Sequence, residues 1–346
     1  MRSTHSEAAV LRTERILLRN LSPEVLVRIA SRVFRRARRR RPPMRIDVAA
    51  HILPERYFAR LQQIPGFLMS RRVKGIRCLV DLSVRFRVMD GFPDYKQVLS
   101  LSLPPIDRLG PPDATPDLAR LGNDALADLV AEHPDRFVGA FGSLPLNNPV
   151  ASVRELERLS GHPAFVGVTI CSNVAGRPLD EPRTLEVIEE AARRDMPIFI
   201  HPARGADVPD YVEEAGSRYD LWQIFGWPYE TTIAMARLVF TGLFDRYPDA
   251  AIITHHMGAM APYFSGRLSG GYDQFGTRSP EQHVEQLPVQ LAHPPQWYFT
   301  RFYADTALNG APHAVRCGLE YFRQSACCSG PTPRSMSKGA PGISAR

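Results

Sequence analysis

The chain has 346 residues, of which 44% are hydrophobic, so it can bury a sizeable core and is long enough for one large barrel-type domain. No apolar run approaches the roughly 18 to 20 residues of a membrane span, and no secretory leader with an apolar centre is recognisable. The spacing of the five cysteines fits neither a metal site nor a disulfide framework: Cys78, Cys171, Cys317, Cys327 and Cys328. We therefore expect a reduced, cytoplasmic protein that binds no membrane.

The basic character of the chain is confined to residues 1–43, where twelve arginines and three glutamates give a net charge of +9. The remaining residues hold 31 basic and 33 acidic side chains, a net charge of −2. The arginine tract could bind nucleic acid, an anionic membrane surface or a targeting receptor. However, no aromatic residues are interleaved with the arginines, and like-charge blocks resist compact folding. We interpret residues 1–43 as a disordered or non-native extension ahead of a natural start at Met44, and expect no nucleic-acid partner.

From Met44 onward, short apolar runs alternate with longer helical patterns, which is typical of a parallel α/β fold. The expected strands are residues 46–51, 97–101, 137–144, 165–171, 198–201, 251–255 and 298–305. The expected helices include residues 116–132, 149–160, 184–194 and 230–246. A closed (β/α)8 barrel of the TIM-barrel type needs one more strand, and its place in the chain is near residue 327. We assign residues 44–326 to this barrel domain.

The first expected strand carries a histidine without the partner that a metal site in this position would use. Side chains two apart on a strand point to the same side, so a His-x-His pair at the mouth of a barrel can place both imidazoles on one metal ion. Here the pair reads Ala49-x-His51. Because a single strand histidine is more often a packed residue than a ligand, the other strands must decide between these two interpretations.

Three other expected strands also end in residues that can ligate a metal or transfer a proton. His201 ends the strand at 198–201, His255 and His256 end the strand at 251–255, and Asp305 ends the strand at 298–305. Each could simply be the polar cap of a strand in a turn. Active sites of α/β barrels are built at the carboxyl ends of the strands, however, so four such ends together favour a catalytic site.

With these residues in place, the chain from Met44 to about Phe322 resembles the amidohydrolase-2 family. This branch of the amidohydrolase superfamily contains aminocarboxymuconate-semialdehyde decarboxylase and the resorcylate-type decarboxylases. The order and spacing of the matching pieces carry the resemblance, and the pieces are Ile46-Asp47-Val48-Ala49-Ala50-His51, His133-Pro134-Asp135-Arg136-Phe137, Ile200-His201-Pro202, Trp227-Pro228-Tyr229-Glu230-Thr231-Thr232, Asp245-Arg246-Tyr247-Pro248 and His256-Met257-Gly258-Ala259-Met260-Ala261-Pro262.

The resemblance implies a divalent metal, zinc or manganese, with His51 and His201 among its ligands. It also implies that His256, the histidine of an H-x-G-x-x-x-P motif, is the acid/base residue, a role suited to an imidazole pKa of about 6.5. His255 is the competing candidate, because neighbouring strand residues face opposite ways and only one of the two should face the interior. Asp305 would be a catalytic-site residue beside the metal rather than the family's metal aspartate.

The last twenty residues, 327–346, depart from the family pattern. Relatives continue the stretch at residues 318–322 with a strand of the type V-L-F-G-T-D-x-P-F, which supplies the metal aspartate. A reading frame moved by one base could turn the segment that begins Cys327-Cys328-Ser329-Gly330-Pro331 into L-F-G-T-D-T-P. We therefore interpret this segment as an aberrant, disordered tail that replaces strand eight and the helices after it. The alternative is a genuine disordered terminus rich in Ser, Pro and Gly.

The resemblance implies a metal-dependent, non-oxidative decarboxylase that acts on a small aromatic or conjugated carboxylic acid. A first alternative is a hydrolase of an ester, amide or lactone, since the same metal could activate bound water. A second is a catalytically impaired remnant or a binding protein, since Ala49 offers no ligand atom and the metal aspartate is missing. The expected partner is the small-molecule acid, and assembly into a homo-oligomer is left open.

Overall fold

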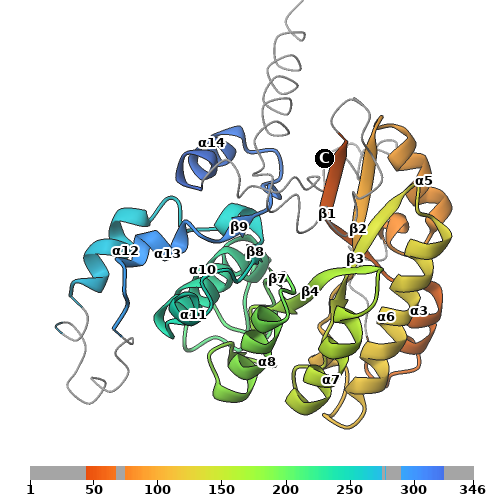
Figure 1. The fold of residues 1–346 in the computed structure, drawn as a ribbon, viewed down its shortest axis with the longest axis horizontal. Coiled ribbons are helices and arrows are strands. Elements are labelled where there is room, and N and C mark those ends of the chain that lie inside the picture. The colour runs from red at the N-terminus through yellow and green to blue at the C-terminus, as the bar shows by residue number, and fades with distance from the viewer. Residues whose placement is uncertain (1–43, 68–74, 275–276, 278–289, 323–346) are drawn as a thin grey trace, which may run out of the picture.

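The computed structural model describes residues 44–67, 75–274, 277 and 290–322. In these residues a curved, parallel sheet of seven strands has the order β1-β2-β3-β4-β7-β8-β9 (Figure 1). Its strands are β1 (Arg45–Ile52), β2 (Tyr95–Leu101), β3 (Phe137–Ser143), β4 (Phe165–Cys171), β7 (Ile198–His201), β8 (Ile252–Thr254) and β9 (Tyr303–Ala304). Each strand pairs in parallel with the strand that precedes it in the sheet, so every crossover passes over the outer face.

Helices fill these crossovers and pack on the outer face of the sheet. Figure 1 shows α3, α5, α6 and α7 along the first strands and α8, α10 and α11 along the later ones. The helices are α3 (Glu55–Leu61), α5 (Leu82–Asp90), α6 (Thr115–Glu132), α7 (Pro149–Ser160), α8 (Pro182–Arg193), α9 (Leu221–Ile224), α10 (Gly226–Phe240), α11 (Leu243–Arg246), α12 (Ser265–Tyr272), α13 (Pro295–Phe299) and α14 (Pro312–Tyr321). A two-stranded hairpin of β5 (Asn173–Val174) and β6 (Arg177–Pro178) comes after β4.

Alternation along the strands divides the core into two clusters. The concave face of the sheet holds a small group of β-branched and aromatic side chains, one from each of β1, β2, β3, β4, β7 and β8: Val48, Val98, Phe141, Val166, Phe199 and Ile253. The larger cluster lies between the sheet and the helices. Both faces of a parallel sheet are buried in this way, which is why its strands are apolar runs that stand out in the sequence.

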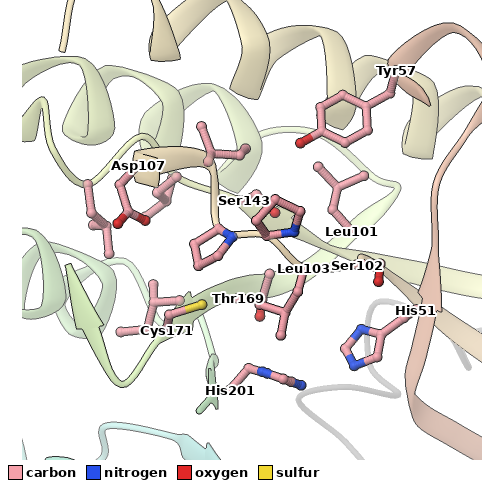
Figure 2. Close-up of a pocket in the computed structure, with 16 residues that line it drawn as sticks. His51, Tyr57, Leu101, Ser102, Leu103, Asp107, Ser143, Thr169, Cys171 and His201 are labelled. Carbon is pink, nitrogen blue, oxygen red and sulfur yellow. The ribbon is translucent and has the colours of Figure 1, made fainter. Parts of the chain in front are cut away.

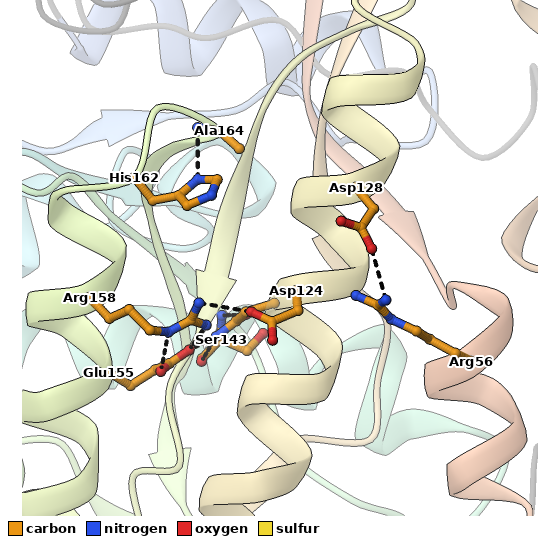
Figure 3. A network of polar contacts seen from close by, with 9 residues as sticks. Arg56, Asp124, Asp128, Ser143, Glu155, Arg158, His162 and Ala164 are labelled. Carbon is orange, nitrogen blue, oxygen red and sulfur yellow. Dashed lines mark hydrogen bonds and ion pairs between the residues drawn. The ribbon is translucent and has the colours of Figure 1, made fainter.

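A buried amide ties two of the helices to strand β3. Asn123 of α6 is fully buried, accepts a hydrogen bond from the Ser143 backbone N–H at 2.8 Å and donates to the Ser143 carbonyl at 2.9 Å. The same amide donates to Glu155 of α7 at 2.7 Å, and Glu155 pairs with Arg158 (Figure 3). Because every polar group of Asn123 has a partner, the position of Ser143 at the end of β3 is firmly set.

The seven expected strands and the parallel α/β architecture are confirmed, and two boundaries need correction. The strand expected at 298–305 shrinks to Tyr303–Ala304, because Pro295 begins a short helix that runs to Phe299. The helix expected at 230–246 is split into α10 and α11 at Gly242, whose φ of 71° lies in the left-handed region that glycine adopts without strain.

In the described residues the sheet ends at β1 on one side and at β9 on the other. The place expected for an eighth strand, near residue 327, lies outside the described residues, as do the predicted extension 1–43 and the predicted tail 327–346. The domain boundaries at 43/44 and 326/327 therefore stay predictions. Among the described helices, none has the length and apolar character needed to cross a membrane.

Candidate functional site

The polar ends of four strands meet at the carboxyl edge of the sheet. His51 lies near the end of β1, His201 is the last residue of β7, His255 follows β8 and Asp305 follows β9. The ring centroids of His51 and His201 are 5.0 Å apart, and those of His201 and His255 are 4.9 Å apart. The fold thus brings together three imidazoles and a carboxylate from distant parts of the chain.

His51 is held on both sides of β1. On the ring side, its Nδ1 lies 2.9 Å from the Ser100 hydroxyl of β2. On the backbone side, its carbonyl accepts a hydrogen bond from the guanidinium of Arg85, which is almost completely buried and also donates to the Cys78 carbonyl at 3.0 Å and to Gln97 at 2.7 Å. A buried cation with three acceptors is a rigid support, so the ring of His51 has a defined place.

One ring nitrogen of His201 has a lone pair that is available to a ligand. Its Nδ1 lies 2.8 Å from the Pro202 carbonyl, and since a carbonyl can only accept, Nδ1 carries the hydrogen and Nε2 is free to accept. Burial, reinforced by His255, lowers the pKa of His51 to about 4 and pushes the pKa of His201 well below its ordinary value. Both imidazoles are therefore neutral near pH 7, the form in which histidine binds a metal.

Both of the neighbouring histidines 255 and 256 reach this cluster, which corrects the expectation that only one would. Their ring centroids lie 3.9 Å apart. The expectation assumed an extended strand, but His256 has a φ of 54° and leaves that conformation, so the alternation of side chains stops there. His256 stacks on Trp227, and its buried Nδ1 has no hydrogen-bond partner among the described residues.

Asp305 orients His255 rather than facing the pair formed by His51 and His201 directly. One carboxylate oxygen is hydrogen-bonded to Nδ1 of His255, and the other accepts from the Ala307 backbone N–H at 3.1 Å. Burial alone would raise the pKa of this carboxyl, but the adjacent His255 outweighs burial and holds the pKa of Asp305 below its usual range. Asp305 is therefore an anion in a fully buried position, and it fixes the tautomer of His255.

A cavity opens beside the first two histidines (Figure 2). It contains about 500 Å³ of empty space, part of which is open solvent. Apolar side chains from the loop after β2 and from the end of β3 form much of its wall. Half of the lining residues carry a polar group: His51, Tyr57, Ser102, Asp107, Ser143, Thr169, Cys171 and His201. This lining fits a small ligand that has both apolar and polar parts.

The structure brings together the two residues that the sequence predicts as metal ligands. His51 and His201 converge with neutral rings, as two ligands of one ion should, and Ala49 adds no donor atom. Within the ranges that the structure describes, no group of three or more His, Cys, Asp or Glu side chains is arranged to hold a metal ion. A third protein ligand, which tight divalent sites commonly have, is thus not among these residues.

Several residues that shape the site carried no signal in the sequence. Arg85 lies on a helix among other charged residues, where an arginine usually faces solvent. Tyr57 looks like an ordinary core residue of α3, and Ser100 like a small residue in a strand. His255 did stand out, but only as the weaker of two candidates. Trp227 belongs to a motif that carried the resemblance, although its contact with His201 at 5.5 Å between ring centroids could not be foreseen.

A parallel sheet with helices outside and histidines at the carboxyl ends of its strands defines a TIM-barrel-like protein of the metal-dependent hydrolase type. The sequence model of the amidohydrolase family matches residues 46–321, which is most of the chain, and the protein belongs to that family. The chain is 31% identical over 199 residues to 2-amino-3-carboxymuconate-6-semialdehyde decarboxylase of Dictyostelium discoideum, covering 58% of this chain and 51% of that protein. It is 33% identical over 200 residues to gamma-resorcylate decarboxylase of Rhodococcus jostii, covering 55% and 60%.

The chain therefore spans about half to three fifths of the length of these two curated relatives. Among solved structures, it resembles 5-carboxyvanillate decarboxylase of Novosphingobium aromaticivorans, crystallised with manganese and 3-methoxy-4-hydroxy-5-nitrobenzoic acid. The TM-score is 0.70 at 26% identity, with 84% of this chain and 87% of that chain covered. The enzyme of the same activity from Sphingomonas paucimobilis, at 23% identity and a TM-score of 0.69, shares the fold.

Proposed function

We propose that this protein is a metal-dependent, non-oxidative decarboxylase of a small aromatic carboxylic acid. The observation that carries the proposal is the neutral pair His51 and His201, whose ring centroids are 5.0 Å apart at one side of a mostly apolar cavity. Such a site favours a carboxylate at the imidazole end and an aromatic ring against the apolar wall. The relatives named above are decarboxylases, which supports the same reaction type.

In this proposal, each polar group at the edge of the sheet has a separate role. His51 and His201 would hold a divalent ion, zinc or manganese, which when bound stabilises negative charge on a substrate oxygen. His256 is the acid/base residue, because its Nδ1 is buried without a partner among the described residues. Burial lowers its pKa to about 3 in the substrate-free site, so the ring is neutral there and takes up its proton only while the negative charge of a substrate lies beside it. Asp305 acts through His255, whose ring it keeps in one tautomer beside His256.

The direct test is release of carbon dioxide from candidate acids by the purified full-length chain, with zinc or manganese supplied. We expect turnover of at least one hydroxylated benzoic acid, and its loss in His201→Ala. Hydrolysis of ester, amide or lactone substrates without any carbon dioxide release would overturn the proposed reaction and favour the hydrolase. Binding of acids without any turnover would point to a binding protein.

The proposal also covers the setting of the enzyme. Its partner is the small acid, and neither nucleic acid nor a membrane is part of the reaction. We propose a cytoplasmic location and leave a homo-oligomer as a further expectation, which size-exclusion chromatography with light scattering would test.

A further inference from the structure

One polar group of the cavity lining has no use in the site described so far. Tyr57 of α3 is 0% exposed, and its hydroxyl has no hydrogen-bond partner among the described residues. Buried hydroxyl groups are normally paired, because an unpaired one gives up its hydrogen bonds to water without replacement. Because Tyr57 lines a cavity, a bound ligand could supply the hydrogen-bond partner that its hydroxyl lacks.

The position of the Tyr57 ring is fixed by the packing around it. Gly122 of α6 faces the ring closely: a Cβ there would lie 3.1 Å from Tyr57 Cδ2 and 2.6 Å from Leu101 Cδ1. A glycine is needed at this close approach, since any side chain would displace the ring or the leucine. The hydroxyl consequently stays at the cavity and cannot swing to another partner.

The cavity separates this hydroxyl from the histidines. Figure 2 shows Tyr57 and His201 on opposite sides of the lining, with the hydroxyl end of the tyrosine turned towards the other lining residues. Between them Figure 2 shows both apolar and polar lining residues, among them Leu103, Ser143 and Thr169. A ligand with its carboxylate at the imidazoles would therefore present the remote part of its ring to Tyr57.

We propose that Tyr57 is a specificity-determining residue, whose hydroxyl forms a hydrogen bond with an oxygen substituent on the ring of the acid, remote from the carboxylate. This inference rests on the proposed function for the placement of the carboxylate. A phenol group can donate to or accept from a substrate hydroxyl, and it can donate to a methoxy or carbonyl oxygen. Burial raises the pKa of Tyr57, so its hydroxyl keeps its hydrogen throughout the working pH range.

Tyr57 should therefore make the protein select among aromatic acids by the position of the oxygen substituent on the ring. An acid that lacks the remote oxygen leaves the Tyr57 hydroxyl unpaired, so it should bind more weakly. A hydroxyl next to the carboxylate cannot compensate, because it lies at the histidine end. We therefore expect 4-hydroxybenzoate to bind at least tenfold more tightly than benzoate, 2-hydroxybenzoate or 4-methylbenzoate, the last of which has nearly the same shape without the hydrogen bond.

The experiment measures dissociation constants of these four acids by calorimetry for the full-length chain and for Tyr57→Phe. In the variant we expect the preference for 4-hydroxybenzoate over benzoate to fall to within threefold, while the affinity for benzoate stays the same. Tyr321→Phe is the matched control, because Tyr321 also has a buried hydroxyl without a partner among the described residues but does not line the cavity. That control should keep the full preference.

Three results would overturn the inference: no preference for 4-hydroxybenzoate over 4-methylbenzoate in the parent, an unchanged preference in Tyr57→Phe, or binding of none of the four acids. The comparison with 4-methylbenzoate needs no variant, so it can overturn the inference even if Tyr57→Phe fails to fold. Carbon dioxide release is measured on the same samples. Preference without release would overturn the proposed decarboxylation and leave the role of Tyr57 intact.

Discussion

The two halves of the site are built in different ways. His51 and His201 belong to the paired strands β1 and β7, and strand β2 and a buried arginine hold the first of them in place. His255 and His256 follow β8, a strand of three residues, in a turn where His256, Met257 and Ala259 all have positive φ. Non-glycine residues in that region are strained and persist only where the surroundings enforce the conformation.

This difference matches the chemistry proposed for each half. Metal ligands need fixed geometry, which paired strands supply. A group that passes a proton needs a ring with a free nitrogen beside the substrate, and the turn after β8 gives His256 that freedom by removing it from the strand alternation. The comparison predicts that the halves can be disabled separately, one by loss of metal and the other by loss of proton transfer.

The largest expected effect separates these two losses. His256→Gln should reduce turnover by about 10²–10⁴-fold, the usual contribution of a general acid or base, and keep the metal content of the parent. His201→Ala should lose both. Bound zinc and manganese measured by elemental analysis after dialysis, together with carbon dioxide release, check this. His162→Ala is the control, since His162 precedes β4 at the opposite edge of the sheet. Equal metal loss in His256→Gln and His201→Ala would end the distinction between the halves.

The next effect concerns the support of the strand half. Arg85→Met should lower the free energy of unfolding by about 3–5 kcal/mol, because it removes the cation of a buried network together with its hydrogen bonds to the carbonyl groups of Cys78 and His51. Asp47, whose pKa burial raises to about 7, would also lose the nearby cation.

Urea unfolding of Arg85→Met, compared with that of Arg87→Met, measures this effect. Arg87 lies on the same helix but is exposed, so its replacement should change the free energy of unfolding by less than about 0.5 kcal/mol. If the two variants were equally stable, Arg85 would not be a support of His51.

The sequence could predict the strand half far better than the turn half. All seven strands were found because parallel strands are buried on both faces and read as apolar runs, and strand-end residues such as His51 and His201 follow directly. The turn after β8 was missed because positive φ at His256 depends on packing against distant segments. The same holds for Tyr57 and Arg85: burial of a phenol at a cavity or of an arginine under a strand is a property of the fold, and no local pattern encodes it.

A third, smaller effect is the pH dependence of stability in the turn half. Burial first and His255 second lower the pKa of His256 to about 3, against 6.5 in the unfolded chain, so the unfolded state binds the proton more readily. The stabilising contribution of the neutral ring is complete above pH 6.5 and is lost as the pH falls through 6.5 towards 3. Acidification in that window should therefore destabilise the parent more than His256→Gln, by about 1–3 kcal/mol.

Urea unfolding of the parent and His256→Gln at several pH values between 7 and 4 tests this. Asp47 contributes in the opposite direction: burial raises its pKa to about 7, so its protonation stabilises the folded state as the pH falls. Parent and His256→Gln both contain Asp47, so this contribution cancels in the difference between them. Replacement of the exposed His293 by glutamine is the control and should leave the pH dependence as in the parent. Parallel curves for parent and His256→Gln would show that the ring is not held neutral by burial.

The smallest effect is expected from removal of residues 1–43, which we place outside both halves of the site. A chain that starts at Met44 should keep the thermal midpoint, metal content and ligand preference of the full-length chain within error. Residues 1–43 carry a net charge of +9, and so many like charges oppose compact packing on a domain of nearly balanced charge. Differential scanning calorimetry of both chains at two salt concentrations measures this. A midpoint lower by several degrees in the shorter chain, or a difference that vanishes at high salt, would mean that the arginine segment packs on the barrel, and the domain boundary at Met44 would have to move.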